Sequence, residues 1–399
     1  GDSLYKSSFF PQNEKALKYD FDILEYVIDA CHQEGILVHA WINPYRISTT
    51  TQIVEEINNK SPAYLWLKDE IVENDKNVCF ESGIYLNPAE SQVQQLIIDG
   101  VREVVRGYDV DGIHFDDYFY PTQSEEFDKA SYDLYKAQNL APLPLADFRR
   151  LNVDLLLSGT YNAIKHIKTG VTFSVSPAAS VDNNYQKLYA DVRSWVDNGF
   201  VDAIIPQLYF GFEYPDDNFK FNNLLKAWCD IADLNPDVKL FIGLGVYKAR
   251  PELEADKAEW QNNSDIIKRQ VEAVYNNDRV DGFVYFSYSS LMSDDNEFKA
   301  QAVKLAQEIG GHKAAKELGV PDGTIYCWIK AFKEGRLSAN EAVHSPRVAL
   351  SLNDELIELR KRVKEQDKEI RRLKEENEFL EEASAFFAAS RRKSAKNRD

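Results

Sequence analysis

The stretch Asp111-Gly-Ile-His-Phe-Asp-Asp-Tyr-Phe-Tyr-Pro121 decides the fold of the larger, N-terminal part of this 399-residue chain. Gly112–Asp117 is apolar and aromatic, which indicates a buried β-strand, and it ends in two adjacent carboxylates. Successive strand residues point to opposite faces, so His114 and Asp116 share one phase. A buried strand that ends in polar groups is typical of an α/β protein with its site at the carboxyl ends of the strands.

Similar segments recur along the chain and alternate with helical patterns. The expected strands are Ile36–Asn43, Gly112–Asp117, Val171–Ser176, Ala203–Tyr209, Leu240–Val246 and Gly282–Ser287. The expected helices are Phe21–Glu34, Ser91–Gly107, Leu145–Lys168, Lys187–Asn198, Phe221–Leu234 and Ser264–Asn277, with Asp20 and Ser264 as N-caps. This alternation predicts parallel strands joined by crossovers. It favours a TIM-type (β/α) barrel, with a doubly wound open sheet as the alternative.

Polar residues lie on one phase at several strand ends, as a catalytic mouth requires. They include His39, Trp41 and Asn43 in one strand, Ser174 and Ser176 in another, and Gln207 and Tyr209 in a third. Asp116, in phase with His114, is the better catalytic candidate, and Asp117 is its helper or holds the loop that follows. Glycoside hydrolysis needs two carboxyl groups across the scissile bond. Spacing does not fix the second one, and Asp2 is a further candidate.

Six motifs in order carry a family resemblance. They are His39-Ala-Trp-Ile-Asn-Pro-Tyr-Arg46, Gly83-Ile-Tyr-Leu-Asn-Pro-Ala89, the stretch 111–121, Ser174-Val-Ser-Pro177, Pro206-Gln-Leu-Tyr209 and Gly243-Leu-Gly-Val-Tyr-Lys248. Residues 1–292 thereby resemble the glycosyl-hydrolase-like ten family, barrel proteins of the bacterial cell envelope. The resemblance implies a glycosidase that acts on peptidoglycan glycan strands stripped of peptides, without a metal or another cofactor. The expected substrate-binding residues are His39, Trp41, Asn43, Arg46, His114, Tyr118, Gln207, Tyr209 and Lys248.

The sequence departs from that family at its start. The family's barrels begin with two strands that find no match here, and Gly1-Asp2-Ser3-Leu4-Tyr5 resembles the loop after the second. We therefore expect a barrel that lacks its first two strands and exposes the edges of the strands beside the gap. Weak or absent hydrolase activity follows from that expectation.

The charge balance changes near residue 295. Residues 1–295 carry 26 Lys and Arg against 47 Asp and Glu, a net of −21, whereas residues 296–399 carry 21 against 18, a net of +3. No apolar run is long enough to cross a membrane, and no signal peptide is recognisable, so a cytoplasmic location is expected for the chain as given. The barrel's relatives are expected in the envelope. The change in charge predicts a domain boundary with different partners on its two sides.

Residues 296–337 fit a helix-turn-helix domain. Helices are expected over Glu297–Glu308, His312–Leu318 and Thr324–Phe332, separated by glycines, and the last would enter the DNA major groove. Ile325, Trp328 and Ile329 are expected to pack inward. An ordinary small helical bundle is the alternative. The expected DNA contacts are Lys313, Lys316, Thr324, Tyr326, Cys327, Lys330 and Lys333.

A heptad repeat follows a linker at 338–350. It predicts a coiled coil over 351–388, ahead of a basic tail at 389–399. The polar Asn377 at an a position favours a parallel dimer, and a single solvated helix is the alternative. The expected dimer contacts are Leu356, Leu359, Val363, Ile370, Leu373, Asn377 and Leu380.

This second part also resembles a family. The segments Phe298-Lys-Ala-Gln-Ala-Val-Lys304, Ala314-Ala-Lys-Glu-Leu-Gly319, Thr324-Ile-Tyr-Cys-Trp328 and 373–391 are similar to the first-frame subunit of insertion-sequence transposases. The resemblance implies binding to terminal repeats of an element and homodimerisation, without a nuclease domain. Three hypotheses follow: a truncated glycan hydrolase, a DNA-binding transposase subunit that carries a barrel remnant, and an engineered fusion in which the zipper dimerises a barrel.

Overall fold

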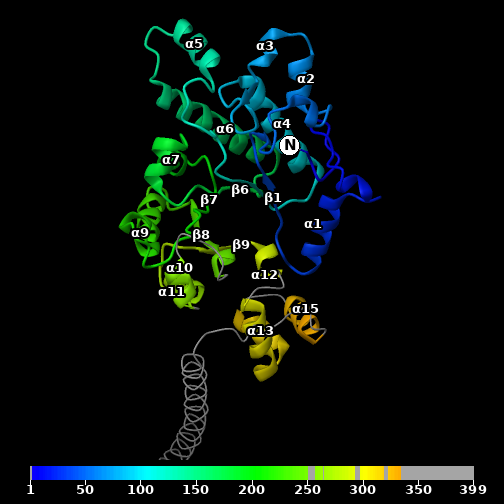
Figure 1. Ribbon diagram of the computed structural model, residues 1–399, viewed down its shortest axis with the longest axis vertical. Helices are drawn as coiled ribbons and strands as arrows, with labels where there is room; N and C mark the ends of the chain where they lie inside the picture. Colours follow the sequence, from blue (N-terminus) through cyan, green and yellow to red (C-terminus); the bar gives the residue numbers. More distant parts are fainter. Residues whose placement is uncertain (1, 250–256, 264, 293–296, 319–321, 334–399) are drawn as a thin grey trace, which may run out of the picture. The chain divides into compact units, whose positions relative to one another are not determined.

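The computed structural model describes the chain apart from residues 1, 250–256, 264, 293–296, 319–321 and 334–399 (Figure 1). The chain divides into two units, Gly1–Ser338 and Ala339–Asp399. The second unit lies wholly outside the described residues. The expected linker, the coiled coil with its contacts from Leu356 to Leu380, and the basic tail therefore fall outside them too, and these expectations stay predictions.

The first unit is built on a curled, parallel, six-stranded sheet with the order β1-β5-β6-β7-β8-β9. Every neighbouring pair is parallel, and the strands follow an open arc (Figure 1). All six expected strands are present. Their bounds are β1 His39–Ile42, β5 Gly112–Phe115, β6 Thr172–Val175, β7 Ala203–Ile204, β8 Lys239–Gly245 and β9 Gly282–Phe286. The expected α/β class is therefore confirmed, in the form of a half-barrel.

Strand β7 is much shorter than the segment expected at 203–209. Pro206 lacks a backbone N–H and cannot donate to a sheet ladder, which ends the regular strand there. Pairing resumes only as isolated bridges of Gln207 to Ala178 and to Gly243. These bridges keep Gln207 beside its neighbouring strands, at the end where the polar residues gather.

Helices connect the strands, mostly where the sequence predicts them. The helices of this part are α1 Ile23–Gln33, α2 Pro62–Lys68, α3 Val72–Asp75, α4 Ser91–Gly107, α5 Lys129–Gln138, α6 Leu145–Ile167, α7 Val181–Lys187, α8 Val192–Asp197, α9 Phe221–Ala232, α10 Lys257–Asn262, α11 Ile266–Tyr275 and α12 Tyr288–Met292. In α4, the buried residues Val93, Ile97, Val101 and Val104 recur at helical spacing, which gives the helix one apolar face for the core.

Two expectations about helices are wrong. The single helix expected at 187–198 is instead the pair α7 and α8, because Tyr189 has a φ of 53°, a left-handed conformation that ends a right-handed helix. The N-cap of α1 is Asp22 rather than Asp20, since the Asp22 carboxylate accepts the N–H groups of Leu24 and Glu25. The expected cap Ser264 lies outside the described residues.

The structure also contains a small antiparallel sheet that the sequence did not predict. Its strands fall between β1 and β5 in the sequence. Its strands are β2 Arg46–Ser48, β3 Val78–Phe80 and β4 Ile84–Leu86, in the order β2-β4-β3. Gly83 leads into β4 so close to β2 that a Cβ on it would lie 2.0 Å from the Ser48 carbonyl oxygen. This close packing fixes the strand that carries Arg46.

Aspartates at the starts of three strands fix the register of the main sheet. Asp111, Asp202 and Asp281 accept the backbone N–H groups of Val38, Phe173 and Leu240 at 2.7, 2.6 and 2.9 Å. Each also pairs with a basic side chain: His32 at 2.9 Å, Lys165 at 2.7 Å and Lys239 at 3.0 Å, respectively. The recurring Val-Asp-Gly or Val-Asp-Ala sequence at 110, 201 and 280 therefore joins each strand start to its neighbour.

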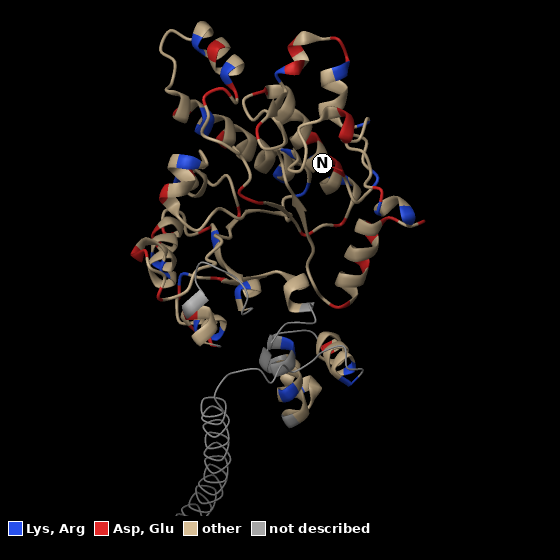
Figure 2. Ribbon diagram, viewed as in Figure 1, with Lys and Arg blue, Asp and Glu red and all other residues tan. Residues whose placement is uncertain are grey.

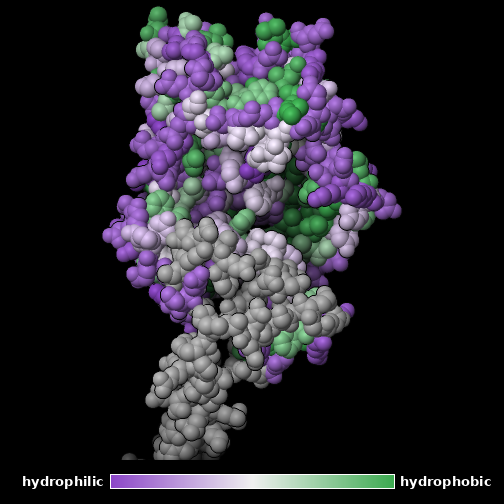
Figure 3. Space-filling model, viewed as in Figure 1, coloured by the Kyte–Doolittle hydropathy of each residue, from purple (hydrophilic) through white to green (hydrophobic). Residues whose placement is uncertain are grey.

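The edges of the sheet are exposed. Among the described residues, β1 pairs only with β5 and β9 only with β8. Leu37 and Trp41 near one edge are 69% and 59% exposed, and Val284 and Phe286 at the other are 41% and 38% exposed. In the space-filling view the surface is hollowed at its centre, and apolar residues gather on the side of α1 (Figure 3).

Three further helices form a small module with a core of its own. They are α13 Glu297–Ile309, α14 Gly311–Leu318 and α15 Asp322–Lys333, close to the expected bounds. Their buried cluster is Ala302, Val303, Ala306, Ala314, Ala315, Ile325 and Trp328. Within the part of the chain that the structure describes, no helix is both long and apolar enough to cross a membrane.

We predict that Asp202→Ala lowers the free energy of unfolding by about 1–3 kcal/mol, because it leaves the Phe173 N–H without its acceptor and removes the carboxylate that pairs with Lys165. Chemical denaturation measures the change. The control Asp197→Ala, at an exposed position on α8, should change stability by less than about 0.5 kcal/mol. Equal effects of the two substitutions would contradict the role given to Asp202.

Candidate active site

Asp116 lies directly after β5 and is 3% exposed. Its Oδ2 accepts hydrogen bonds from Asn43 Nδ2 at 2.8 Å and from Trp41 Nε1 at 3.3 Å. These contacts follow from the register, which places Trp41 opposite His114 and Ile42 opposite Phe115. The next step along both strands brings Asn43 to Asp116, so two polar residues on the same phase meet at the carboxyl end of the sheet.

Burial makes Asp116 a weaker acid than an exposed aspartate. It raises the pKa of this carboxyl to about 6, with a further contribution from the negative charge of Asp117. Three other groups lower the pKa of Asp116: the Tyr118 backbone N–H, the Trp41 indole and the charge of Arg46. Asp116 Oδ1 is buried and has no hydrogen-bond partner among the described residues. The carboxyl is therefore protonated in part of the population near neutral pH.

Asp117 has different surroundings. Burial also raises its pKa, but a hydrogen bond from Gln207 and the charge of Arg46 oppose that rise. Gln207 is held in place because its amide also donates to the Ser176 carbonyl at 2.9 Å. Two adjacent carboxyls thus differ in their partners, Asn43 and Trp41 for one and Gln207 for the other.

Two histidines of the sheet are held neutral: His114 in β5, and His39, which is the first residue of β1 and lies opposite Gly112 at the amino ends of the strands. Burial lowers the pKa of His114 to about 4, and protonation of His39 would oppose a charge on His114 further. His114 Nδ1 lies 2.8 Å from Ser174 Oγ. Burial also lowers the pKa of His39, whose ring lies so close to Gly112 that a Cβ there would be 2.5 Å away. Neither imidazole therefore supplies a positive charge to the site at neutral pH.

An aromatic cluster forms one wall beside these groups. The Tyr209 ring is stacked on Phe286, with centroids 5.6 Å apart and planes at 16°, and Tyr247 contacts both edge-on. Gly245 makes room for Tyr209, since a Cβ there would lie 3.0 Å from that ring. The sequence did not identify Phe286 and Tyr247 as site residues, because an aromatic residue near a strand end resembles any core residue until its neighbours are known.

Cations lie over two of the site's rings. The Arg46 guanidinium carbon is 4.0 Å from the centroid of the Tyr118 ring, which is half exposed. Lys248, in the 3-10 helix Val246–Ala249, has its Nζ 5.0 Å from the Phe210 ring centroid. At these distances both contacts are cation–π interactions. They fix two positive charges beside aromatic surfaces.

Asp2 stands apart from these contacts. It is exposed, and its neighbour Ser3 bridges to Gln12. No hydrogen bond described for Asp116 or Asp117 involves Asp2. Within the described ranges, no group of three or more His, Cys, Asp or Glu side chains is arranged to hold a metal ion.

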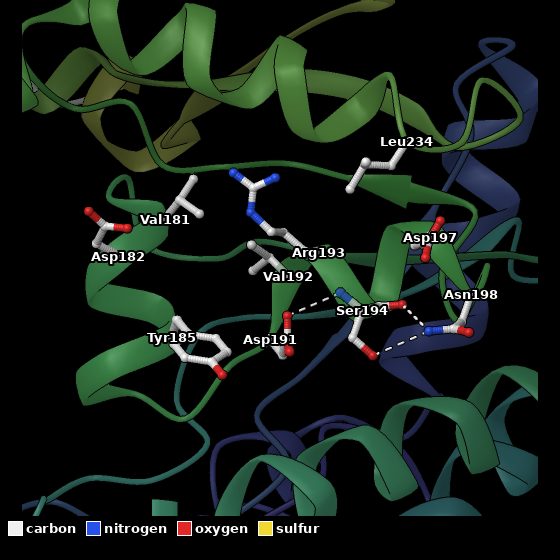
Figure 4. Close-up of a pocket in the computed structure, with 10 residues that line it drawn as sticks. All are labelled: Val181, Asp182, Tyr185, Asp191, Val192, Arg193, Ser194, Asp197, Asn198 and Leu234. Atoms are coloured by element: carbon white, nitrogen blue, oxygen red, sulfur yellow. Dashed lines mark hydrogen bonds between the residues drawn. The ribbon is translucent and has the colours of Figure 1, made fainter. Parts of the chain in front are cut away.

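A separate hollow lies on the outer helices and shares no residue with this site (Figure 4). Its polar groups cap α8: Asp191 accepts the Ser194 N–H at 3.1 Å, and Asn198 Nδ2 donates to the Ser194 carbonyl at 2.9 Å. The hollow is lined by Val181, Asp182, Tyr185, Asp191, Val192, Arg193, Ser194, Asp197, Asn198 and Leu234.

The helical module presents several of the expected DNA contacts. On α15, Ile325 and Trp328 are buried and Ile329 is half-buried, whereas Tyr326, Cys327, Lys330 and Lys333 are exposed. Basic residues of the described helices are blue in Figure 2. Thr324 is half-buried, Lys313 on α14 is exposed, and the Lys316 side chain lies outside what the structure describes. Positions 326, 330 and 333 recur at helical spacing, so they form one outward face.

Comparison with known families matches the two parts separately. The family model described as "Glycosyl hydrolase-like 10" matches residues 1–262, and the one described as "Transposase" matches residues 295–378. Both resemblances found in the sequence are therefore confirmed at the level of family.

Similar proteins have been named as glycosyl hydrolases. Glycosyl hydrolase DigH of Escherichia coli (strain K12) is 34% identical over 276 residues, which cover 63% of this chain and 60% of the relative. Glycosyl hydrolase YngK of Bacillus subtilis (strain 168) is 28% identical over 313 residues, covering 73% and 58%. The chain thus spans less than two thirds of the length of these curated relatives. A solved glycoside hydrolase domain, that of PgaB (BpsB) from Bordetella bronchiseptica, is 12% identical with a TM-score of 0.46, over 73% of this chain and 80% of that chain.

We predict that Asp116→Asn stabilises the protein at pH 8 by about 1–3 kcal/mol. The folded-state pKa of about 6 lies above the unfolded value, so the wild type loses stability as pH rises from about 4 to 6. The variant does not titrate there, and its advantage should vanish below about pH 4. Denaturation curves across this range measure the difference. The control Asp237→Asn, at an exposed carboxylate, should change stability by less than about 0.5 kcal/mol. A gain from Asp116→Asn that is the same at every pH would contradict the buried acid.

Proposed function

Since the chain belongs to the glycosyl hydrolase-like 10 family over residues 1–262, we propose that its half-barrel is a glycosidase unit with Asp116 as the proton donor. The observation that carries this proposal is the buried Asp116 carboxyl, held between Asn43 and Trp41 at the carboxyl ends of two strands. A general acid for glycoside cleavage must still hold its proton near the working pH. The raised pKa of Asp116 supports that role.

Asp117 is the second carboxylate in this proposal. Gln207 and Arg46 favour its ionised form relative to burial alone. As the bond between the anomeric carbon and the leaving oxygen breaks, the Asp116 proton passes to that oxygen. In an inverting reaction, water adds to the anomeric carbon and gives its proton to Asp117. In a retaining reaction, Asp117 first forms a glycosyl ester, and the water that breaks this ester gives its proton to the Asp116 carboxylate, which releases Asp117. Asp2 stays the alternative second carboxylate.

The proposed substrate is a peptidoglycan glycan strand without its peptides. Pyranose rings stack on aromatic side chains, and Trp41 and Tyr118 are both at least half exposed at the site. Removing the peptide leaves a carboxylate on alternate sugars, which suits the cations of Arg46 and Lys248. His39, His114 and Tyr209 complete the proposed substrate-binding set, together with Asn43 and Gln207.

We propose that a complete active-site wall needs two more β/α units beside the free edges of β1 and β9. Both edges are unpaired within the described part of the chain and carry exposed apolar side chains, including Trp41 and Phe286. A parallel strand added at each edge would pair its backbone groups and cover those side chains. Without these units, substrate contacts from that quarter of the wall are missing.

The C-terminal part carries a second candidate function, which the match of residues 295–378 to a transposase family favours. We propose that α15 enters the major groove of DNA, with Thr324, Tyr326 and Cys327 at base edges and the lysines at 313, 316, 330 and 333 on phosphates. The heptad at 351–388 would hold two copies together. In the alternative reading, DNA binding and dimerisation in transposition, within the cytoplasm, are the whole role, and the half-barrel is a remnant.

We predict that the purified chain hydrolyses denuded glycan strands at least about 100-fold more slowly than a full-length relative, because the missing wall removes transition-state contacts. Release of reducing ends measures turnover. Asp116→Asn and Asp117→Asn should abolish any activity that remains, whereas Asp237→Asn should not. Turnover equal to that of a full-length relative would overturn the need for further strands.

We predict that Lys330→Ala and Lys333→Ala together weaken binding to the terminal repeat of an insertion element and reduce the salt dependence of log K by about two counterions. Gel shifts at several salt concentrations measure both effects. Lys268→Ala on α11, an exposed lysine outside the module, is the control. A chain that shows no salt-sensitive DNA binding would contradict this function.

A further inference from the structure

Phe286 connects the last strand of the sheet to the first. It is the final residue of β9, and its ring contacts Trp41 edge-on, with centroids 6.3 Å apart and planes at 71°. Tyr209 is stacked on the same ring, at 5.6 Å and 16°. These separations lie within the range in which aromatic pairs attract one another. Phe286 is therefore held by Tyr209 and in turn contacts the indole of Trp41.

Trp41 needs such support. It lies on the edge strand β1 and is 59% exposed, so burial does not fix its side chain. Its ring contacts are with Phe286 and, at 6.2 Å, with His114. Its Nε1 reaches Asp116 Oδ2 at 3.3 Å, slightly longer than the usual range for an N–H···O bond. A small movement of the indole away from Asp116 would therefore break this hydrogen bond.

We propose that Phe286 is a positioning residue, whose ring holds the Trp41 indole against the Asp116 carboxyl. The inference deepens the proposed function, because it rests on Asp116 as the acid of that site. Phe286 acts through Trp41 and donates nothing itself. The arrangement ties the geometry of the acid to β9, the strand farthest from β1 in the order of the sheet.

Other groups around Asp116 also influence its pKa, and a test of Phe286 must take them into account. Asn43 donates to the same oxygen, Asp117 and Arg46 act through their charges, and the Tyr118 N–H belongs to the loop after β5. Neutral His114 contacts the indole edge-on. Of these, only the indole is in ring contact with Phe286, so loss of the Phe286 ring should reach Asp116 through Trp41.

The test is the titration of Asp116 in the full chain, followed by carboxyl ¹³C NMR with the signal assigned by its absence in Asp116→Asn. Phe286→Leu keeps an apolar side chain but removes the ring. It should raise the pKa of Asp116 by about 0.5 unit, because a donor to the ionised form is lost. Trp41→Phe should raise it at least as much. Phe286→Tyr, which keeps the ring, and Val284→Ala, on the same exposed face of β9, should leave it unchanged.

The double variant decides whether the effect passes through the indole. Phe286→Leu should cause no further shift in the Trp41→Phe background. An equal shift in both backgrounds, or no shift from Phe286→Leu while Trp41→Phe shifts the pKa, would overturn the proposal. If Phe286→Leu does not fold, a shifted pKa in the folded Phe286→Tyr protein would overturn it as well. The titration requires no turnover, so it gives its answer even if the chain hydrolyses no glycan.

Discussion

Three aspartate side chains, at the starts of β5, β7 and β9, each bind a backbone N–H of the neighbouring strand. Asp111 fixes β5 against β1 at the end of the sheet opposite the candidate site. A parallel strand that slipped by one residue would turn its whole set of side chains to the other face. In that case Asp116 would lose Asn43 and Trp41, and His114 would lose Ser174. The chemistry at the carboxyl ends therefore depends on hydrogen bonds made at the amino ends.

With the register fixed, burial sets the properties of the site. A carboxyl that is 3% exposed and next to a second carboxyl costs stability in its ionised form, and no positive imidazole lies beside it to offset that cost. If only stability mattered, position 116 would hold an apolar residue or an amide such as asparagine. Departures of this kind from the rules of a stable core are typical of functional sites. The aromatic cluster of Tyr209, Tyr247 and Phe286 adds to the effect, because rings in place of water strengthen every charge interaction nearby.

The sequence alone predicts those features of the fold and the site that depend on neighbouring residues in the chain. Apolar runs with polar ends predicted all six strands, and the alternation of phase placed Trp41, Asn43 and Asp116 on one face before any pairing was known. It could not show that Asn43 contacts Asp116, because that depends on which residues pair across strands. The three-residue strands of the small sheet are too short to show a period. The break at Tyr189 follows from a left-handed conformation that its residue type does not announce. Phe286 was missed for a different reason: an apolar residue at a strand end resembles any other core residue until its neighbours are known.

The two parts place opposite electrostatic demands on one chain. Residues 1–295 carry a net charge of −21, which repels phosphate, whereas the DNA-binding role proposed for the C-terminal module would require that module to attract phosphate. At physiological salt the Debye length is about 8 Å, so the repulsion acts only on DNA that comes close to the acidic surface. The lysines of α14 and α15 act over contact distances and are screened less. Lower salt would strengthen both the attraction by these lysines and the repulsion by the acidic part. The net effect on affinity would then depend on how near the bound DNA passes to the acidic half-barrel. A salt dependence shallower than the lysine contacts alone require would be the sign that this repulsion acts on the complex.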